Sequence, residues 1–167
     1  ADPGFADPAR EFEVLWFAGA AKVVENLGPE ARALLDPGLL EICEQGAGYS
    51  AIDYLTATAR RMDLGRLMGL FHERYDLLLT PTMPIAAFEA GVEVPPGSAY
   101  RRWTGWTPLT YPFNMTQQPA ASLPCGFTSG GLPIGLQVVG ARHADALVMT
   151  ACAAYEKARP WKRFTRR

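Results

Sequence analysis

The residues of this sequence that could do chemistry as a pair are Cys125 and His143. Cys125 lies between Pro124 and Gly126 at the end of an apolar run, and His143 follows 18 residues later. A thiol at a strand end, with a histidine brought beside it across a hairpin, would form the nucleophile and base of a cysteine hydrolase. The other interpretation is that Cys125 is a small buried hydrophobic residue, the common state of a free cysteine. Nothing in the sequence around Cys125 indicates an activated thiolate, so the second interpretation is favoured.

The remaining nucleophiles, bases and metal ligands do not form a complete set either. No serine lies in the Gly-x-Ser-x-Gly context that presents a nucleophile. His72 and His143 are 71 residues apart, and no pair of cysteine or histidine residues has ligand spacing, so no metal site is predicted. We expect His72, beside Glu73 and Arg74, to be a solvated histidine near a helix end. The glycine-rich turn at 128–131 lies between two predicted strands, whereas a phosphate-binding loop precedes a helix, so no cofactor is predicted.

The composition is that of a globular protein of about one domain. The chain has 167 residues, 49% of them hydrophobic and 20% charged, with a formal net charge of −1. Because a dedicated nucleic-acid binder needs surplus Lys and Arg, this balance argues against one. The longest uncharged stretch, residues 103–141, is rich in proline and glycine and therefore cannot be a membrane helix. Three widely spaced cysteines and no recognisable signal peptide indicate a reducing, cytoplasmic location. Since the sequence begins with Ala1 rather than Met, we expect a piece of a longer protein.

Helices dominate the first half of the predicted fold. Asp7 and Pro8 are predicted to start a helix that ends near Gly28, with Trp16 and Val23 on its inner face. A second helix is predicted from Asp36 to about residue 46. The third is predicted to begin at a capping box and to end near residue 75, and its inner face is predicted to carry Leu55, Met62 and Phe71. That capping box consists of Ser50 and Asp53.

Strands follow from Asp76 onward. Residues 76–80 read as a short buried strand, and residues 89–100 as an exposed, Gly/Pro-rich excursion. Residues 120–127 and 133–140 are predicted to form a β-hairpin whose turn is 128–131. Asp145 is predicted to cap a last helix that reaches about Lys157, and a cationic tail runs from 156 to 167. The order of these elements favours one α/β unit.

Three segments resemble consecutive landmarks of the amidase signature enzymes. They are residues 75–84 (YDLLLTPTMP), 111–126 (YPFNMTQQPAASLPCG) and 131–140 (GLPIGLQVVG), in the order and at the spacing of that family. The resemblance extends over essentially all of residues 1–167. It implies an α/β chain, the C-terminal portion of the amidase signature fold, with a mixed β-sheet flanked by helices. One departure is Gln117, where the family more often has glycine.

The resemblance also implies where the chemistry lies. Amidase signature enzymes hydrolyse an amide C–N bond with a serine nucleophile, a second serine on a cis peptide and a lysine, which pass through an acyl-enzyme. Those three residues come from a Gly/Ser-rich N-terminal half, and no such stretch occurs here. The chain is therefore expected to contribute no catalytic residue and to be inactive alone. Its expected partners are a small-molecule amide and the N-terminal half of the same enzyme, with a homo-oligomer left open and neither nucleic acid nor membrane expected.

By position in the family, this chain would supply one wall of the substrate pocket. The residues implied to line that wall are Thr82, Met83, Thr104, Thr107 and Tyr111. Met83 and Tyr111 could equally be plain core residues. In the glutamyl-tRNA amidotransferase A chain, an Asp matches Thr107 and looks placed to bind the ammonium group of glutamine. The neutral, partly aromatic surroundings of Thr107 suit an uncharged amide better, which leaves the amidotransferase, or a non-catalytic binding fragment, as the alternatives.

Overall fold

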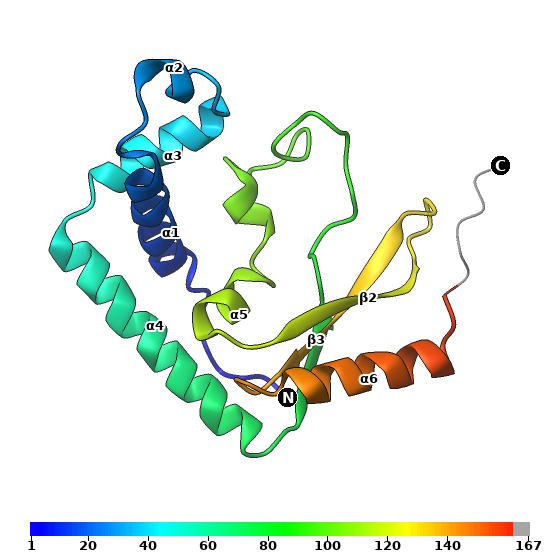
Figure 1. Cartoon of the computed structure of the whole chain (residues 1–167). Helices are drawn as coiled ribbons and strands as arrows, with labels where there is room; N and C mark the ends of the chain where they lie inside the picture. Colours follow the sequence, from blue (N-terminus) through cyan, green and yellow to red (C-terminus); the bar gives the residue numbers. More distant parts are fainter. Residues whose placement is uncertain (162–167) are drawn as a thin grey trace. The chain divides into compact units, whose positions relative to one another are not determined.

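The computed structural model describes residues 1–161, which form two compact units (Figure 1). One unit is Pro8–Leu64, and the other combines residues 1–7 with residues 65 onward. Helix α4, Ala51–His72, runs from the first unit into the second. The predicted cationic tail lies outside the described residues from Lys162 to its end. Within residues 1–161, no helix has the length and apolar character needed to cross a membrane.

The first unit is built on a close crossing of two helices. Its helices besides the start of α4 are α1 (Ala9–Val24), α2 (Pro29–Arg32) and α3 (Pro37–Ala47). The predicted start of α3 is confirmed, because the Asp36 side chain accepts a hydrogen bond from the Leu39 N–H at 3.1 Å. Gly46 of α3 lies against the backbone of Phe17 in α1, where a Cβ atom would overlap the Phe17 carbonyl group. Only glycine permits this separation of the two helices.

The predicted boundaries and inner face of α1 are partly wrong. Pro8, not Asp7, is the N-cap residue, and it makes no side-chain capping bond. The helix ends at Val24, and the Arg32 guanidinium donates to the carbonyl oxygen of Val24 at 2.8 Å, which satisfies one of the last carbonyls of the helix. Val23, predicted to face inward, is 80% exposed, because the face that packs inward carries Phe17.

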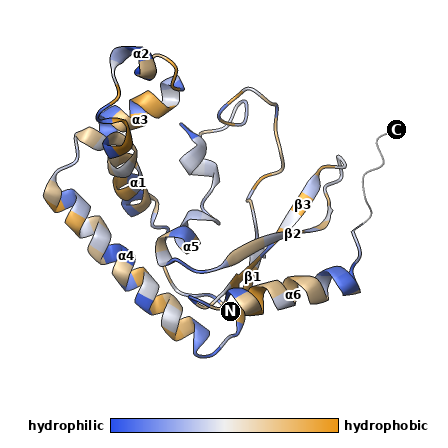
Figure 2. Cartoon of the chain, in the orientation of Figure 1, coloured by the Kyte–Doolittle hydropathy of each residue, from blue (hydrophilic) through white to orange (hydrophobic). Residues whose placement is uncertain are grey.

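The capping box that starts α4 is confirmed. The Ser50 N–H donates to the Asp53 carboxylate at 2.9 Å, and the Asp53 N–H donates to the Ser50 hydroxyl at 3.1 Å. The helix ends at His72, three residues earlier than predicted. Hydrophobic and hydrophilic residues alternate along its whole length (Figure 2). The predicted inner face is wrong for Leu55 and Met62, which are exposed, because α4 carries apolar residues on two sides and periodicity cannot choose between them.

The second unit contains the predicted hairpin and strand as one three-stranded sheet. Its strands are β1 (Leu77–Pro81), β2 (Ala120–Phe127) and β3 (Pro133–Gly140), in the order β1-β3-β2, and both pairings are antiparallel. Helix α6 (Asp145–Ala158) packs on one face through Val148 and Cys152, against Leu123 and Val138. The α/β class is thereby confirmed. Ala144 is the N-cap residue of α6, so the predicted capping by Asp145 is wrong.

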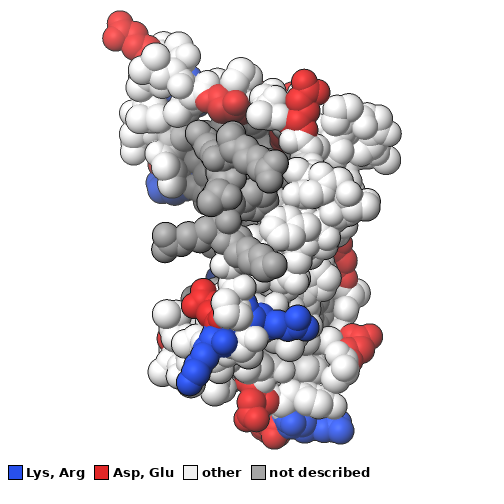
Figure 3. Space-filling model, turned by 90° about the vertical axis from the view of Figure 1, so that its right-hand side faces the viewer, with Lys and Arg blue, Asp and Glu red and all other residues white. Residues whose placement is uncertain are grey.

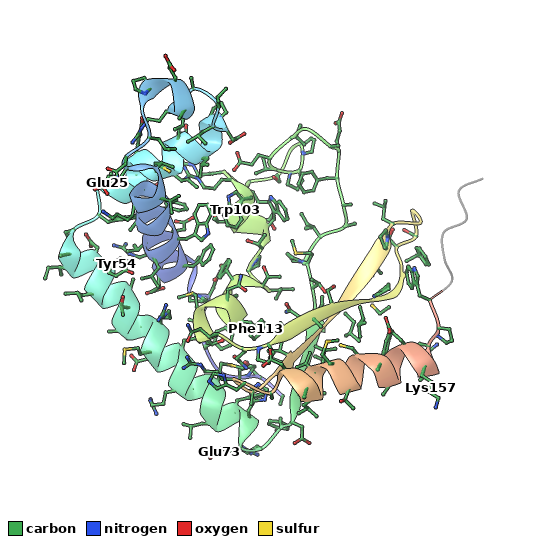
Figure 4. All side chains as sticks on the ribbon, viewed as in Figure 1. Glu25, Tyr54, Glu73, Trp103, Phe113 and Lys157 are labelled. Atoms are coloured by element: carbon green, nitrogen blue, oxygen red, sulfur yellow. The ribbon has the colours of Figure 1, made fainter. Side chains whose placement is uncertain are left out.

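Two short helices in the second unit were not predicted from the sequence. They are the 3₁₀ helix η1 (Trp103–Trp106) and helix α5 (Tyr111–Thr116). Phe113 of α5, labelled in Figure 4, packs with Met68 of α4 and Val139 of β3 on the sheet face opposite α6. Gln117 follows α5 with φ 59° and ψ 36°, the left-handed conformation that glycine adopts without strain. This conformation explains why the family more often has glycine at this position, and Gln117 is the departure from that pattern.

Candidate functional site

Two polar rungs cross the sheet on the face that carries Val139. In the inner rung, the buried Gln137 side chain donates to the Thr80 hydroxyl at 2.9 Å and to the Leu109 carbonyl oxygen at 2.7 Å. In the outer rung, the hydroxyls of Thr82 and Ser122 are 2.7 Å apart. The inner rung is satisfied within the protein, whereas the outer rung lies at the surface of the sheet. The outer rung is therefore the part of this face that a ligand can reach.

The outer rung depends on a glycine in the central strand. Thr82 follows β1, Ser122 is on β2, and Gly135 of β3 lies between them, with the Thr82 N–H donating to the Gly135 carbonyl oxygen at 2.9 Å. A Cβ atom at position 135 would be 2.7 Å from the Thr82 Oγ1 atom and 2.8 Å from the Ser122 Oγ atom. The two hydroxyls meet across β3 because residue 135 has no side chain.

A groove of about 780 Å³ opens over this rung. Its walls come from the loop that follows β1, from η1 and from the ends of β2 and β3. The lining residues are Thr82, Met83, Pro84, Ile85, Ala86, Ala87, Phe88, Trp106, Ser122, Pro124, Thr128, Pro133, Ile134 and Gly135. None of these side chains is charged, and the polar ones are hydroxyls. Such a lining favours an uncharged, largely apolar ligand. On the face of the molecule drawn in Figure 3, by contrast, acidic and basic side chains lie among the uncharged ones.

The aromatic wall of the groove is held by the excursion that precedes η1. The indole N–H of Trp106 donates to the Glu93 carbonyl oxygen at 2.9 Å, and the Trp103 N–H donates to the Glu93 carboxylate at 3.2 Å. The rings of Phe88 and Trp106 pack edge to face with centroids 5.4 Å apart. The segment predicted as an exposed excursion is thus tied to η1 through Glu93, which positions Trp106 in the groove.

The residues predicted to line a pocket divide into two groups. Thr82 and Met83 line the groove. Thr104 is buried, and the Thr107 hydroxyl donates to the carbonyl oxygens of Trp103 and Thr104, so both residues help to close η1 beside the groove. Tyr111 is 2% exposed and its hydroxyl donates to Asp7, which makes it a core residue.

Of the residues that line the groove, only Thr82 and Met83 were predicted as site residues; Phe88 and Ser122 are among those that were not. The sequence did carry a signal for Ser122. It lies two residues before Pro124, on the same face of a predicted strand, and the predicted partner strand contains Gly135. Only the register, with Pro124 opposite Gly135 and Ser122 opposite Gln137, shows that Ser122 reaches Thr82. Trp106 was expected from the sequence only as one of the aromatic neighbours of Thr107, and it lines the groove.

The cysteine hydrolase hypothesis is wrong, and so is the alternative of a buried Cys125, because this residue is exposed. Cys125 is the bulged residue of β2 beside Gly135, whereas His143 lies beyond Gly140 at the opposite end of β3. The five residue-to-residue steps from 135 to 140 span about 16 Å in a strand, so the two side chains cannot form a nucleophile–base pair. Burial raises the pKa of the Cys43 thiol, with a small opposing effect from Arg32. Burial also raises the pKa of the Cys152 thiol, and Glu156 adds to that increase.

His72 is not the solvated histidine that was predicted. Its Nδ1 atom donates to the Tyr75 carbonyl oxygen at 2.9 Å, and its Nε2 atom accepts from the Gln118 amide at 2.8 Å. The same amide nitrogen donates to the Gly140 carbonyl oxygen at 2.8 Å. His72 therefore joins the end of α4 to the end of β3 and is structural. Among residues 1–161, no three His, Cys, Asp or Glu side chains gather in a way that could hold a metal ion.

Comparison with known proteins decides the family. A family model described as Amidase matches residues 10–149. This chain belongs to the amidase family. It is 33% identical to an acylamidase of Rhodococcus erythropolis over 167 residues, which covers 96% of this chain and 35% of the relative. It is 37% identical to the glutamyl-tRNA(Gln) amidotransferase A chain of Cyanothece sp. over 138 residues, which covers 82% of this chain and 27% of that protein.

Solved structures of amidase family members share the fold. A bacterial aryl acylamidase of the amidase signature family superposes with a TM-score of 0.75 at 27% identity, covering 96% of this chain and 36% of that one. The crystal structure of another amidase gives a TM-score of 0.77 at 29% identity, with 92% and 36% covered. The fold expected from the amidase resemblance is confirmed. The chain spans about a third of the length of these relatives.

Proposed function

We propose that this chain is the C-terminal part of an amidase that hydrolyses a carboxylic amide C–N bond, and that its groove is one wall of the substrate pocket. The observation that carries this proposal is the uncharged groove, which is formed in part by segments 75–84 and 131–140, the same segments that resemble the amidase signature enzymes. An amide is uncharged, and its flanking groups are commonly apolar. The groove matches both properties.

The bond-breaking residues are proposed to come from a preceding segment of the same enzyme. The groove lining contains no lysine, histidine or cysteine, so it offers neither a base nor a thiol nucleophile. In the amidase signature mechanism a neutral lysine accepts a proton through the middle serine while the first serine attacks the carbonyl carbon. That proton is then passed to the leaving amine as the C–N bond breaks, which gives an acyl-enzyme that water hydrolyses. This chain binds the substrate in that scheme and does not act on its bond.

The second candidate is the A chain of a glutamyl-tRNA amidotransferase. The 37% identity to the Cyanothece protein favours it. Glutamine carries an ammonium and a carboxylate group, and burying either without an opposite charge is costly. Since the groove lining holds no charged side chain, a neutral amide remains the better match. A non-catalytic binding fragment is the third candidate. A cytoplasmic location is part of the proposal and rests on the three free cysteines.

The test is hydrolysis of a neutral aryl amide, such as 4-nitroacetanilide, by two purified proteins. One is this chain, and the other is the protein expressed from the whole gene, with any residues encoded before Ala1. We expect no turnover by the chain and turnover by the longer protein. Glutamine as the preferred substrate of the longer protein would favour the amidotransferase candidate. Absence of amide hydrolysis by both proteins would favour the binding fragment, and light scattering on the same samples measures any self-association.

A further inference from the structure

The hydroxyls of Thr82 and Ser122 keep hydrogen-bonding capacity that the protein does not use. Two hydroxyls have two donors and four acceptor lone pairs, and their mutual bond uses one of each. Among the described residues, neither hydroxyl has another hydrogen-bond partner. One O–H donor and several lone pairs therefore face the groove at one point. A group that both donates and accepts would satisfy that point.

The rest of the groove gives a ligand apolar contact and no charge. Met83, Phe88 and Trp106 provide the large apolar surfaces, and Gly135 forms a flat floor under the hydroxyl pair. A charged ligand group would lose water there and gain no opposite charge. Moving a neutral amide out of water costs less free energy than moving an ion. Its carbonyl oxygen and N–H also match the free donor and lone pairs of the two hydroxyls.

We propose that the Thr82–Ser122 hydroxyl pair, held together across Gly135, is the polar anchor of the groove. It hydrogen-bonds an uncharged amide group of a ligand whose apolar part lies against Met83, Phe88 and Trp106. This inference rests on the proposed function for its choice of an amide. Beyond the proposed function, it identifies the residues that select a neutral ligand group and gives the reason that a charged group binds more weakly.

Three ligands of the same shape test the anchor: benzamide, benzamidine and benzoate, which are neutral, cationic and anionic at pH 7. Their dissociation constants are measured by ligand-observed NMR on the protein expressed from its whole gene, so that no turnover is needed. We expect benzamide to bind about tenfold or more tightly than either ion. Equal affinities for the three ligands would overturn the proposal.

Variants separate the hydroxyls from the apolar walls. Thr82→Val and Ser122→Ala should weaken benzamide binding about three- to tenfold and leave toluene binding unchanged, because only benzamide uses the hydrogen bonds. Thr82→Ser keeps the hydroxyl and should retain benzamide affinity. Met83→Ala is the matched control and should weaken both ligands alike. Unchanged benzamide affinity in both Thr82→Val and Ser122→Ala would contradict the anchor.

Failure of this inference and failure of the proposed function give different results. If the whole-gene protein hydrolyses 4-nitroacetanilide but binds the three benzene derivatives alike, the anchor is wrong and the amidase assignment stands. If benzamide binds selectively and no amide is hydrolysed, the anchor stands and the amidase assignment fails. Gly135→Ala adds a check of the geometry, because a methyl group there separates the two hydroxyls and should reduce benzamide affinity as much as Thr82→Val does.

Discussion

The Tyr111 hydroxyl donates a hydrogen bond to the Asp7 carboxylate, which lies 104 residues earlier in the chain. This bond explains one difference from the sequence-based predictions, at Asp7, and decides between the two interpretations of Tyr111. Asp7 does not cap α1, because its carboxylate accepts from the tyrosine, and Tyr111 points into the core rather than into a pocket. The bond also joins the first seven residues to the unit that holds the sheet.

Removing that hydroxyl should reduce stability without affecting ligand binding. Tyr111→Phe keeps the buried ring and deletes the bond to a charged acceptor, so we expect the free energy of unfolding to fall by about 1.5–3 kcal/mol. Urea denaturation of the purified protein measures the change. Benzamide affinity is the control readout and should not change. A loss of benzamide affinity without a loss of stability would instead indicate that Tyr111 contacts the ligand.

Thr107 is proposed to influence ligand binding through η1. A carboxylate introduced by Thr107→Asp would face the carbonyl oxygens of Trp103 and Thr104, which repel it, and no cation is at hand in the groove lining. In the active enzyme, apolar amides should lose kcat/KM by about tenfold or more, while amides bearing an ammonium group lose less. Acetamide, which is too small to reach Trp106, should change little, and Thr107→Ser should resemble the wild type. Equal losses on all three substrates would show that Thr107 only supports the fold.

The α1–α3 crossing should be intolerant of a single methyl group. Gly46→Ala would place a Cβ atom on top of the Phe17 carbonyl group, so the helices must separate. We expect a loss of several kcal/mol in unfolding free energy, seen as a lower urea midpoint. Gly19→Ala is the matched control, since Gly19 lies in α1 with nothing within 4 Å of a Cβ atom. That substitution should stabilise the protein by about 0.5–1 kcal/mol. Similar effects of the two substitutions would contradict the close crossing.

Replacing Gln117 by glycine should increase the stability of the protein. Its side chain is exposed and its φ of 59° is costly for any residue with a Cβ atom. Gln117→Gly should therefore raise the free energy of unfolding by about 1 kcal/mol, although glycine also gains freedom in the unfolded chain. Gln117→Ala retains the Cβ atom and should give no such gain. Thermal melts of the three proteins decide between these outcomes.

The capping box of α4 should make the stability of the protein depend on pH in the acidic range. Hydrogen bonds from the Ser50 hydroxyl and then the Ser50 N–H lower the pKa of Asp53 below its ordinary value of 3.8, and Arg10 adds a smaller effect. A lowered pKa in the folded state contributes stability that is present above 3.8 and is lost as the pH falls through the folded value. The difference in unfolding free energy between the wild type and Asp53→Asn should therefore close as the pH drops below about 4. A constant difference from about pH 6 to about pH 2 would contradict this coupling.

Local patterns determined much of the fold. The start of α3, the capping box of Ser50 and Asp53, and the turn of the hairpin at 128–131 all follow from contacts between residues a few positions apart. Their partners are close in sequence, so the residue types alone select the conformation. The three resembling segments likewise identified the amidase family, and the resemblance predicted a pocket role for Thr82 and Met83, which line the groove.

Tertiary structure decided what the sequence left open. Both sides of α4 carry apolar residues, so only its packing shows that Met68 is buried and Met62 is exposed. Thr82 and Ser122 are 40 residues apart, and their meeting depends on the order β1-β3-β2 and on a glycine in the middle strand. The hydrogen bond between Tyr111 and Asp7 likewise joins residues far apart in the sequence and depends on the tertiary structure. A side chain that can donate or accept a hydrogen bond has many possible partners, and the folded backbone alone determines which one lies within about 3 Å.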